Sequence, residues 1–123
     1  MPSDEARELV LEMARLLDEQ KAEDVVVFDV AGLTSVADYF VVSTARNARH
    51  MKALSRHITE LAGSRGKRIL GEEGAPESGW ILIDAADIIV HIFDQDKRRL
   101  YNLELLWGDA GELKTENDAE NKK

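Results

Sequence analysis

Two carboxylates are spaced so that they could hold a divalent cation for phosphoryl-transfer chemistry. Asp84 and Asp87 flank a short turn between two strand-like runs, and oxygen ligands of this kind suit Mg²⁺. A nucleotidyltransferase is expected to carry a Gly-Ser loop followed by Asp-x-Asp, and the chain does not contain this motif. It also lacks a Walker loop and a Rossmann glycine fingerprint. We therefore predict that both aspartates stabilise the turn, and metal-dependent nucleotide chemistry is kept as the alternative.

The histidines do not predict a metal centre. His50 and His57 are seven residues apart, and on a helix this spacing separates them by about 10 Å, too far for joint binding of one zinc ion. His91 lies in an alternating strand-like run, on the same side as Phe93. Because the chain has no cysteine, thiolate and disulfide chemistry are excluded as well. The sequence thus predicts no catalytic residue, no metal and no cofactor.

The apolar patterning predicts a single α/β domain that would position these residues. In order, we expect a helix capped by Ser3, strands at 25–30 and 39–43, a helix capped by Asn47, strands at 69–72, 80–84 and 88–93, and a last helix at 100–107. This order describes a mixed sheet of about five strands flanked by helices, rather than an alternating parallel fold. We place the domain at residues 1–110 and expect the highly charged tail, 111–123, to be disordered.

Charge is distributed unevenly along the chain. The net charge of −8 argues against a general nucleic-acid coat protein. Residues 1–24 hold eight acids and three bases, whereas residues 46–68 hold seven bases and one acid. A local basic face is therefore predicted on the second helix, formed by Arg49, His50, Lys52 and Arg56. Solvation alone accounts for such a face, so we treat a contact with RNA as auxiliary.

The segment 87–108 carries more apolar surface than one strand and one short helix can bury. Six of the eight residues from Leu100 to Trp107 are apolar, and they occupy two faces of the predicted helix. Trp80, Tyr101 and Trp107 are aromatics of the type that anchors protein interfaces. Either both faces belong to the core, or one of them binds another protein, and composition does not say in which assembly.

Several motifs in this chain resemble one known family. The matching stretches are residues 38–44 (DYFVVST), 49–54 (RHMKAL), 71–74 (GEEG), 80–84 (WILID), 87–93 (DIIVHIF) and 99–110 (RLYNLELLWGDA). In this order and at this spacing they resemble the Iojap family, the bacterial ribosomal silencing factors. The resemblance covers roughly residues 5 to 110.

The resemblance implies a nucleotidyltransferase-like core that is not an enzyme. It implies binding of the large ribosomal subunit at ribosomal protein fourteen, a steric block of joining with the small subunit, and repression of translation when nutrients are scarce. The residues carried over by motif as partner-binding are Trp80, His91, Tyr101, Asn102, Leu103, Glu104 and Trp107. Aromatic side chains would supply buried area, and Asn102 and Glu104 directional polar contacts. Leu103 and Trp107 are also candidates for the core.

Location and oligomeric state are further expectations. The N-terminus carries no recognisable secretory signal or transit peptide and no apolar run reaches membrane length, so we expect a cytoplasmic protein. Family members are often dimeric, and Leu105 stands where relatives often carry lysine, which favours a homodimer.

Two alanines stand where the family usually has glycine. These are Ala45, in the turn after Thr44, and Ala86, in the turn before Asp87. Because alanine resists positive φ, each turn either adopts right-handed geometry or is strained by about 1 kcal/mol or more.

Overall fold

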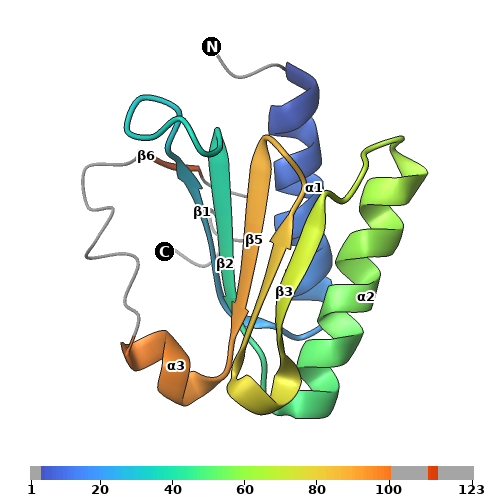
Figure 1. The fold of residues 1–123 in the computed structure, drawn as a ribbon, viewed down its shortest axis with the longest axis vertical. Coiled ribbons are helices and arrows are strands. Elements are labelled where there is room, and N and C mark those ends of the chain that lie inside the picture. Colours follow the sequence, from blue (N-terminus) through green and yellow to red (C-terminus); the bar gives the residue numbers. More distant parts are fainter. Residues whose placement is uncertain (1–3, 101–110, 114–123) are drawn as a thin grey trace.

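The computed structural model describes residues 4–100 and 111–113. Its elements are α1 (Asp4–Glu19), β1 (Glu23–Asp29), β2 (Tyr39–Thr44), α2 (Ala48–Ser64), β3 (Gly71–Ala75), the 3-10 helix η1 (Pro76–Ser78), β4 (Trp80–Asp84), β5 (Ile88–Phe93), α3 (Gln95–Leu100) and β6 (Gly111–Leu113). The expected succession of helices and strands up to β5 is confirmed, as is the α/β class with a mixed sheet (Figure 1). The nucleotidyltransferase-like character of the core stays a prediction.

The strands form one sheet in the order β3-β4-β5-β2-β1-β6. The β2 and β5 strands run parallel, whereas every other neighbouring pair is antiparallel. The sheet has one strand more than expected, because β6 pairs with β1, with Gly111 opposite Asp29 and Leu113 opposite Val27. This short strand begins at the first residue assigned to the predicted disordered tail. Residues 114–123 lie outside the described part, so the rest of that prediction is untested.

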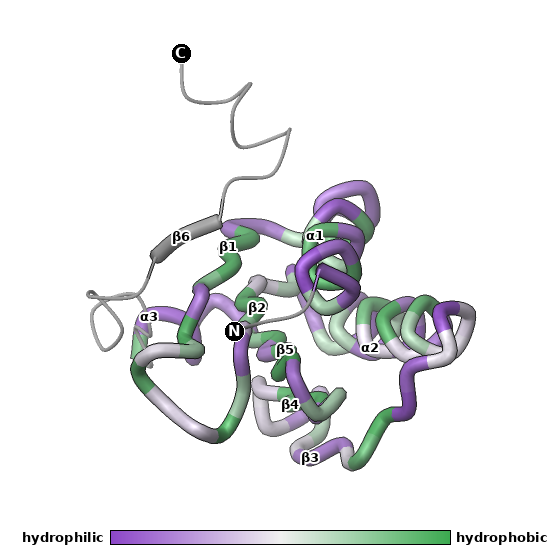
Figure 2. Tube along the Cα trace, turned by 90° about the horizontal axis from the view of Figure 1, so that it is seen from above, coloured by the Kyte–Doolittle hydropathy of each residue, from purple (hydrophilic) through white to green (hydrophobic). Residues whose placement is uncertain are grey.

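The α1 and α2 helices lie together on one face of the sheet (Figures 1 and 2). Apolar residues recur on α1 at the helical period, so that Val10, Met13 and Leu17 form a single buried stripe. From α2 this stripe meets Met51, Leu54 and Ile58, and alternate residues of the strands, including Val41, Ile83 and Val90, complete the main core. The apolar residues that alternate along the strands therefore pack against those that recur at helical spacing on α1 and α2.

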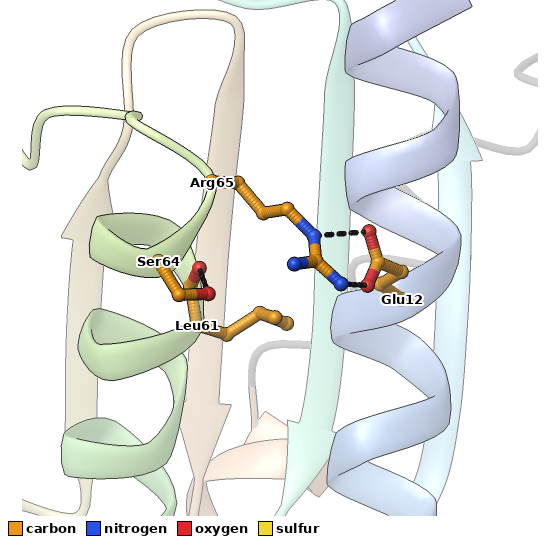
Figure 3. A network of polar contacts seen from close by, with 4 residues as sticks. All are labelled: Glu12, Leu61, Ser64 and Arg65. Atoms are coloured by element: carbon orange, nitrogen blue, oxygen red, sulfur yellow. Dashed lines mark hydrogen bonds and ion pairs between the residues drawn. The ribbon is translucent and has the colours of Figure 1, made fainter.

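A pair of charged residues joins the two helices. The Arg65 guanidinium, just after α2, contacts the Glu12 carboxylate on α1, with Nε 3.0 Å from Oε1 and a second contact from Nη2 to Oε2 (Figure 3). The hydrogen bond from Arg65 lowers the pKa of Glu12, with the guanidinium charge acting in the same direction. Ser64 ends α2 by donating from its hydroxyl to the Leu61 carbonyl at 2.7 Å.

The last described helix begins earlier than expected. Asp94 caps α3 by accepting from the Lys97 backbone N–H at 2.7 Å, so the helix follows β5 at once and ends at Leu100. The sequence pattern predicts this helix at 100–107 instead. Residues 101–107 lie outside the described part, so a helix there is untested.

The two alanine turns adopt different geometries. Ala86 has φ of +67°, so this β4–β5 turn takes the strained alternative. Its backbone N–H donates to Asp84 Oδ1 at 2.9 Å, which helps to hold the left-handed conformation. Ala45 is buried and does not have a positive φ, and its N–H donates to the Phe93 carbonyl at 2.7 Å. Ala45 therefore does not need the left-handed conformation that Ala86 adopts.

Candidate functional site

The second face of the sheet, which neither α1 nor α2 covers, gathers aromatic side chains from three adjacent strands. Alternation along β2, β4 and β5 brings these side chains to one side, and the antiparallel register sets Trp80 opposite Phe93 and Leu82 opposite His91. Phe40 reaches the same side from β2. We call this set of five residues, Phe40, Trp80, Leu82, His91 and Phe93, the aromatic face.

The rings of the aromatic face pack against one another. His91 and Phe93 are stacked, with centroids 5.9 Å apart and planes 2° apart, and Phe40 meets His91 edge-on at 5.2 Å and 76°. Trp80 lies over Phe93 with centroids 5.0 Å apart. Phe93 is fully buried, whereas Trp80 and Leu82 remain partly exposed. The accessible part of the face is therefore held in place by a buried aromatic layer.

His91 links that layer to Trp80 by a hydrogen bond. The indole Nε1–H of Trp80 donates to His91 Nδ1 at 3.3 Å. Because an indole nitrogen is only a donor, Nδ1 must accept, and the neutral imidazole carries its proton on Nε2. The side chain is 6% exposed, and burial lowers the pKa of His91 to about 4. His91 is therefore neutral at pH 7, and its buried Nε2 has no hydrogen-bond partner in the described part of the chain.

A glycine fixes where Trp80 begins its strand. Gly79 has φ of +82°, and a Cβ at this position would lie 2.4 Å from Asp94 Oδ2. Its carbonyl accepts from the Asp94 N–H at 2.9 Å, so the start of β4 packs on the start of α3. Beside this junction is a groove of about 290 Å³, lined by Glu73, Gly74, Ser78, Trp80, Leu82 and Lys97. Only glycine fits this close approach without a shift of its neighbours.

The predicted basic residues separate into two groups. Arg49, Lys52 and Arg56 lie along α2 and line a hollow of about 730 Å³. Both ring nitrogens of His50 instead make hydrogen bonds to the backbone. Its Nδ1 accepts from the Arg46 N–H at 3.0 Å, and its Nε2 donates to the Gln20 carbonyl oxygen at 2.8 Å. This arrangement fixes the loop before α2 to the end of α1. The structure therefore does not bring His50 into the hollow.

The two candidate catalytic carboxylates already have contacts. Asp84 Oδ1 accepts from the Ala86 N–H, and Asp87 Oδ2 lies 3.1 Å from Lys67 Nζ. These contacts agree with the turn-stabilising interpretation. Within residues 4–100 and 111–113, no group of three or more His, Asp or Glu side chains could hold a metal ion. No helix in this part of the chain is long and apolar enough to cross a membrane.

Comparison with known proteins gives the family. The model of the family described as "Ribosomal silencing factor during starvation" matches residues 3–123, almost the whole chain. The chain belongs to the ribosomal silencing factor family. Its members' names describe regulators of translation on the ribosome rather than enzymes, which fits the absence of a catalytic motif.

Relatives cover most of the chain. The ribosomal silencing factor of Bacillus subtilis is 39% identical over 97 residues, 79% of this chain and 82% of the relative. The chloroplast Iojap protein of Arabidopsis thaliana is 28% identical over 89% of this chain, which spans 45% of the plant protein. A crystal structure of a Chromobacterium violaceum protein superposes with a TM-score of 0.76 at 31% identity, covering 88% of each chain. The resemblance to the Iojap family seen in the sequence is thereby confirmed.

Of the partner-binding residues expected for a ribosomal silencing factor, the structure brings Trp80 and His91 together on the aromatic face. Tyr101, Asn102, Leu103, Glu104 and Trp107 lie outside the described residues, so they stay predictions. Sequence reasoning missed Phe40 and Leu82, although strand alternation could have indicated both. No sequence pattern indicates that Lys97 lines the groove, because its position depends on where α3 begins.

Proposed function

We propose that the chain binds the large ribosomal subunit through ribosomal protein fourteen and covers the surface that meets the small subunit. Joining of the subunits is then blocked sterically, and translation falls under nutrient limitation. No covalent bond is made or broken and no cofactor is needed. The protein acts in the cytoplasm and is a homodimer in isolation. Membership of the silencing factor family supports the ribosomal partner, and the aromatic face is the observation that carries the choice of surface.

The aromatic face has the properties of an interface anchor. Binding energy in protein interfaces concentrates in a few large aromatic side chains, and tryptophan is prominent among them. Trp80 is partly exposed at a groove and is held by its hydrogen bond to His91 and its contact with Phe93. A side chain that is already ordered loses little conformational entropy on binding. Trp80 is therefore the residue expected to contribute most to ribosome binding.

The other proposed residues divide by role. His91 is too buried to offer contact area, so it acts by positioning Trp80. Tyr101, Leu103 and Trp107 extend the apolar surface, and Asn102 and Glu104 supply directional polar contacts. The homodimer is tested by analytical ultracentrifugation of the wild type and Leu105→Lys. Two identical monomer profiles would remove that part of the proposal.

Sedimentation with purified large subunits tests the binding surface. The wild type should pellet with the subunits, and Trp80→Ala should weaken binding by about thirtyfold or more, the size of a hot-spot loss. Tyr101→Ala should also weaken it. Leu70→Ala is the matched control, because Leu70 is 61% exposed and lies outside the aromatic face. Equal pelleting of Trp80→Ala and Leu70→Ala would contradict the proposed surface.

A conservative variant separates the ring from its hydrogen bond. Trp80→Phe keeps an aromatic ring over Phe93 but removes the indole N–H that contacts His91. If positioning by His91 matters, Trp80→Phe should bind with an affinity between those of the wild type and Trp80→Ala. Binding equal to the wild type would restrict the contribution of Trp80 to its apolar area.

A further inference from the structure

Three cations on α2 have no acidic partner among the described residues, unlike Arg65 and Lys67 just beyond the end of the helix. Arg65 contacts Glu12 (Figure 3), and Lys67 contacts Asp87, so each of these two cations is paired with a carboxylate. Arg49, Lys52 and Arg56, by contrast, make no ion pair with any residue in the described ranges. In a chain of net charge −8, this is a local excess of positive charge.

Helix stability does not explain where these cations lie. The first turn of α2 contains no acidic residue, and Arg49 is in that turn. The N-terminal end of a helix carries a partial positive charge, so acids stabilise it and cations destabilise it. The last turn of α2, where cations would be favourable, contains none. Arg49 therefore opposes the helix dipole, and such a placement is expected where the charge serves a ligand.

The three cations line one hollow, which we call the basic hollow. It has a volume of about 730 Å³, and its lining residues are Arg49, Lys52, Ala53, Ser55, Arg56, Thr59 and Glu72. Glu72 is the one acid among them, and its Oε1 accepts from the Ser55 hydroxyl at 2.9 Å. Three cations against one carboxylate leave the lining positive.

The shape of the basic hollow indicates the kind of anion that it takes. Seven residues of α-helix place Arg49 and Arg56 about 10 Å apart along the axis. A row of cations of this length matches successive phosphates of a nucleic-acid backbone better than one small anion. The hollow is lined by α2 and by Glu72 of the edge strand β3, whose carboxylate contacts Ser55 of α2, so it lies on the helix-covered side of the sheet. Figure 2 shows α2 on one side of the sheet. The hollow therefore stays accessible when the aromatic face, on the other side, is occupied.

We propose that the basic hollow binds backbone phosphates of ribosomal RNA and gives the protein a second contact on the large subunit. This inference rests on the proposed function and names a second partner for it. Two contacts on opposite sides of one rigid sheet strengthen binding together, because the second contact forms within the same complex.

Salt-dependent sedimentation with large subunits tests the proposal. The variant Lys52→Gln/Arg56→Gln removes two charges from the hollow, and Arg15→Gln/Arg68→Gln removes two exposed charges elsewhere. Between about 50 and 200 mM salt, the hollow variant should bind about tenfold or more weakly, and its log–log salt slope should be smaller by about 2. The control should resemble the wild type. Equal affinities and slopes for the two variants would overturn the proposal.

A gain of binding provides a test that a folding defect cannot imitate. Glu72→Gln removes the negative charge of the hollow and keeps an oxygen that can accept from the Ser55 hydroxyl. This variant should bind large subunits about threefold more tightly at low salt, and the gain should vanish at high salt. Unchanged or weaker binding would count against a phosphate ligand.

Binding to RNA alone distinguishes this inference from the proposed function. Fluorescence anisotropy with a short labelled RNA duplex should show binding by the wild type and Trp80→Ala, and reduced binding by the hollow variant. Failure of the wild type to pellet with subunits, with this RNA result intact, would refute the proposed function and the second contact on the subunit, and would leave the hollow as an RNA-binding surface. No difference between the hollow and control variants on RNA would refute the inference alone. Displacement of the duplex by micromolar nucleoside triphosphate would assign the hollow to a small ligand and overturn the assignment to RNA.

Discussion

The aromatic face and the basic hollow lie on different sides of the same sheet and differ in how their side chains are held. On the aromatic face, Phe93 is fully buried, and Trp80 is fixed by ring contacts and a hydrogen bond. In the basic hollow, Arg49, Lys52 and Arg56 make no ion pair with any described residue. Folding and the proposed binding therefore share residues on the aromatic face but are separable in the hollow.

The two regions should differ most in how much the truncation of one side chain lowers the free energy of unfolding. Phe93→Ala removes a fully buried aromatic residue and should lower the free energy of unfolding by about 3–5 kcal/mol. Lys52→Ala in the hollow should change it by no more than about 0.5 kcal/mol. Urea unfolding followed by circular dichroism measures both. If both variants lose a similar free energy of unfolding, the two regions do not differ in their contribution to folding.

Acid should weaken the aromatic face through His91. Its pKa is about 4 in the folded protein and about 6.5 in the unfolded chain, so the unfolded state binds the proton first as pH falls. The stabilisation is present above pH 6.5, and about 2 kcal/mol of it should be lost by pH 5. His91→Phe should lack this component, whereas His57→Gln on α2 should keep it. Parallel stability–pH curves for the wild type and His91→Phe would contradict the buried, neutral imidazole.

The smallest expected change in stability is a gain, and it concerns a cation of the hollow. Arg49→Gln removes a cation from the first turn of α2 and should raise the free energy of unfolding by about 0.3–1 kcal/mol at low salt. The same variant should bind RNA less well. Thermal unfolding at low and high salt measures the gain, which should shrink as salt screens the dipole. A loss of stability would show that Arg49 supports the fold rather than a ligand.

The sequence predicted the order of elements up to β5 because the relevant signals are local. Alternation in 88–93 correctly placed His91 on the side of Phe93, and the spacing of apolar residues identified both long helices. The β6 strand was not predicted, because three residues pair with β1 across more than eighty positions of chain. The alanine that replaces a family glycine at position 86 was identified as a site of strain or altered geometry, and it is strained.

The candidate site was only partly predictable. Trp80 and His91 were selected by family motif, but their hydrogen bond depends on the β4–β5 register. His50 contacts Arg46, four residues away, but its second contact is with Gln20, thirty residues away, which local sequence patterns do not indicate. The basic hollow was expected as a charged helix face, yet its closure by Glu72 required the position of the edge strand.

The proposed function requires that the protein prevent the ribosomal subunits from joining by occupying the large one through its aromatic face. Purified small and large subunits mixed after addition of the protein, and separated on a sucrose gradient, test this directly. The wild type should lower the fraction of joined ribosomes as its concentration rises, and Trp80→Ala should require about thirtyfold more protein for the same effect. If saturating wild-type protein binds the large subunit but does not reduce joining, the proposed steric block is wrong.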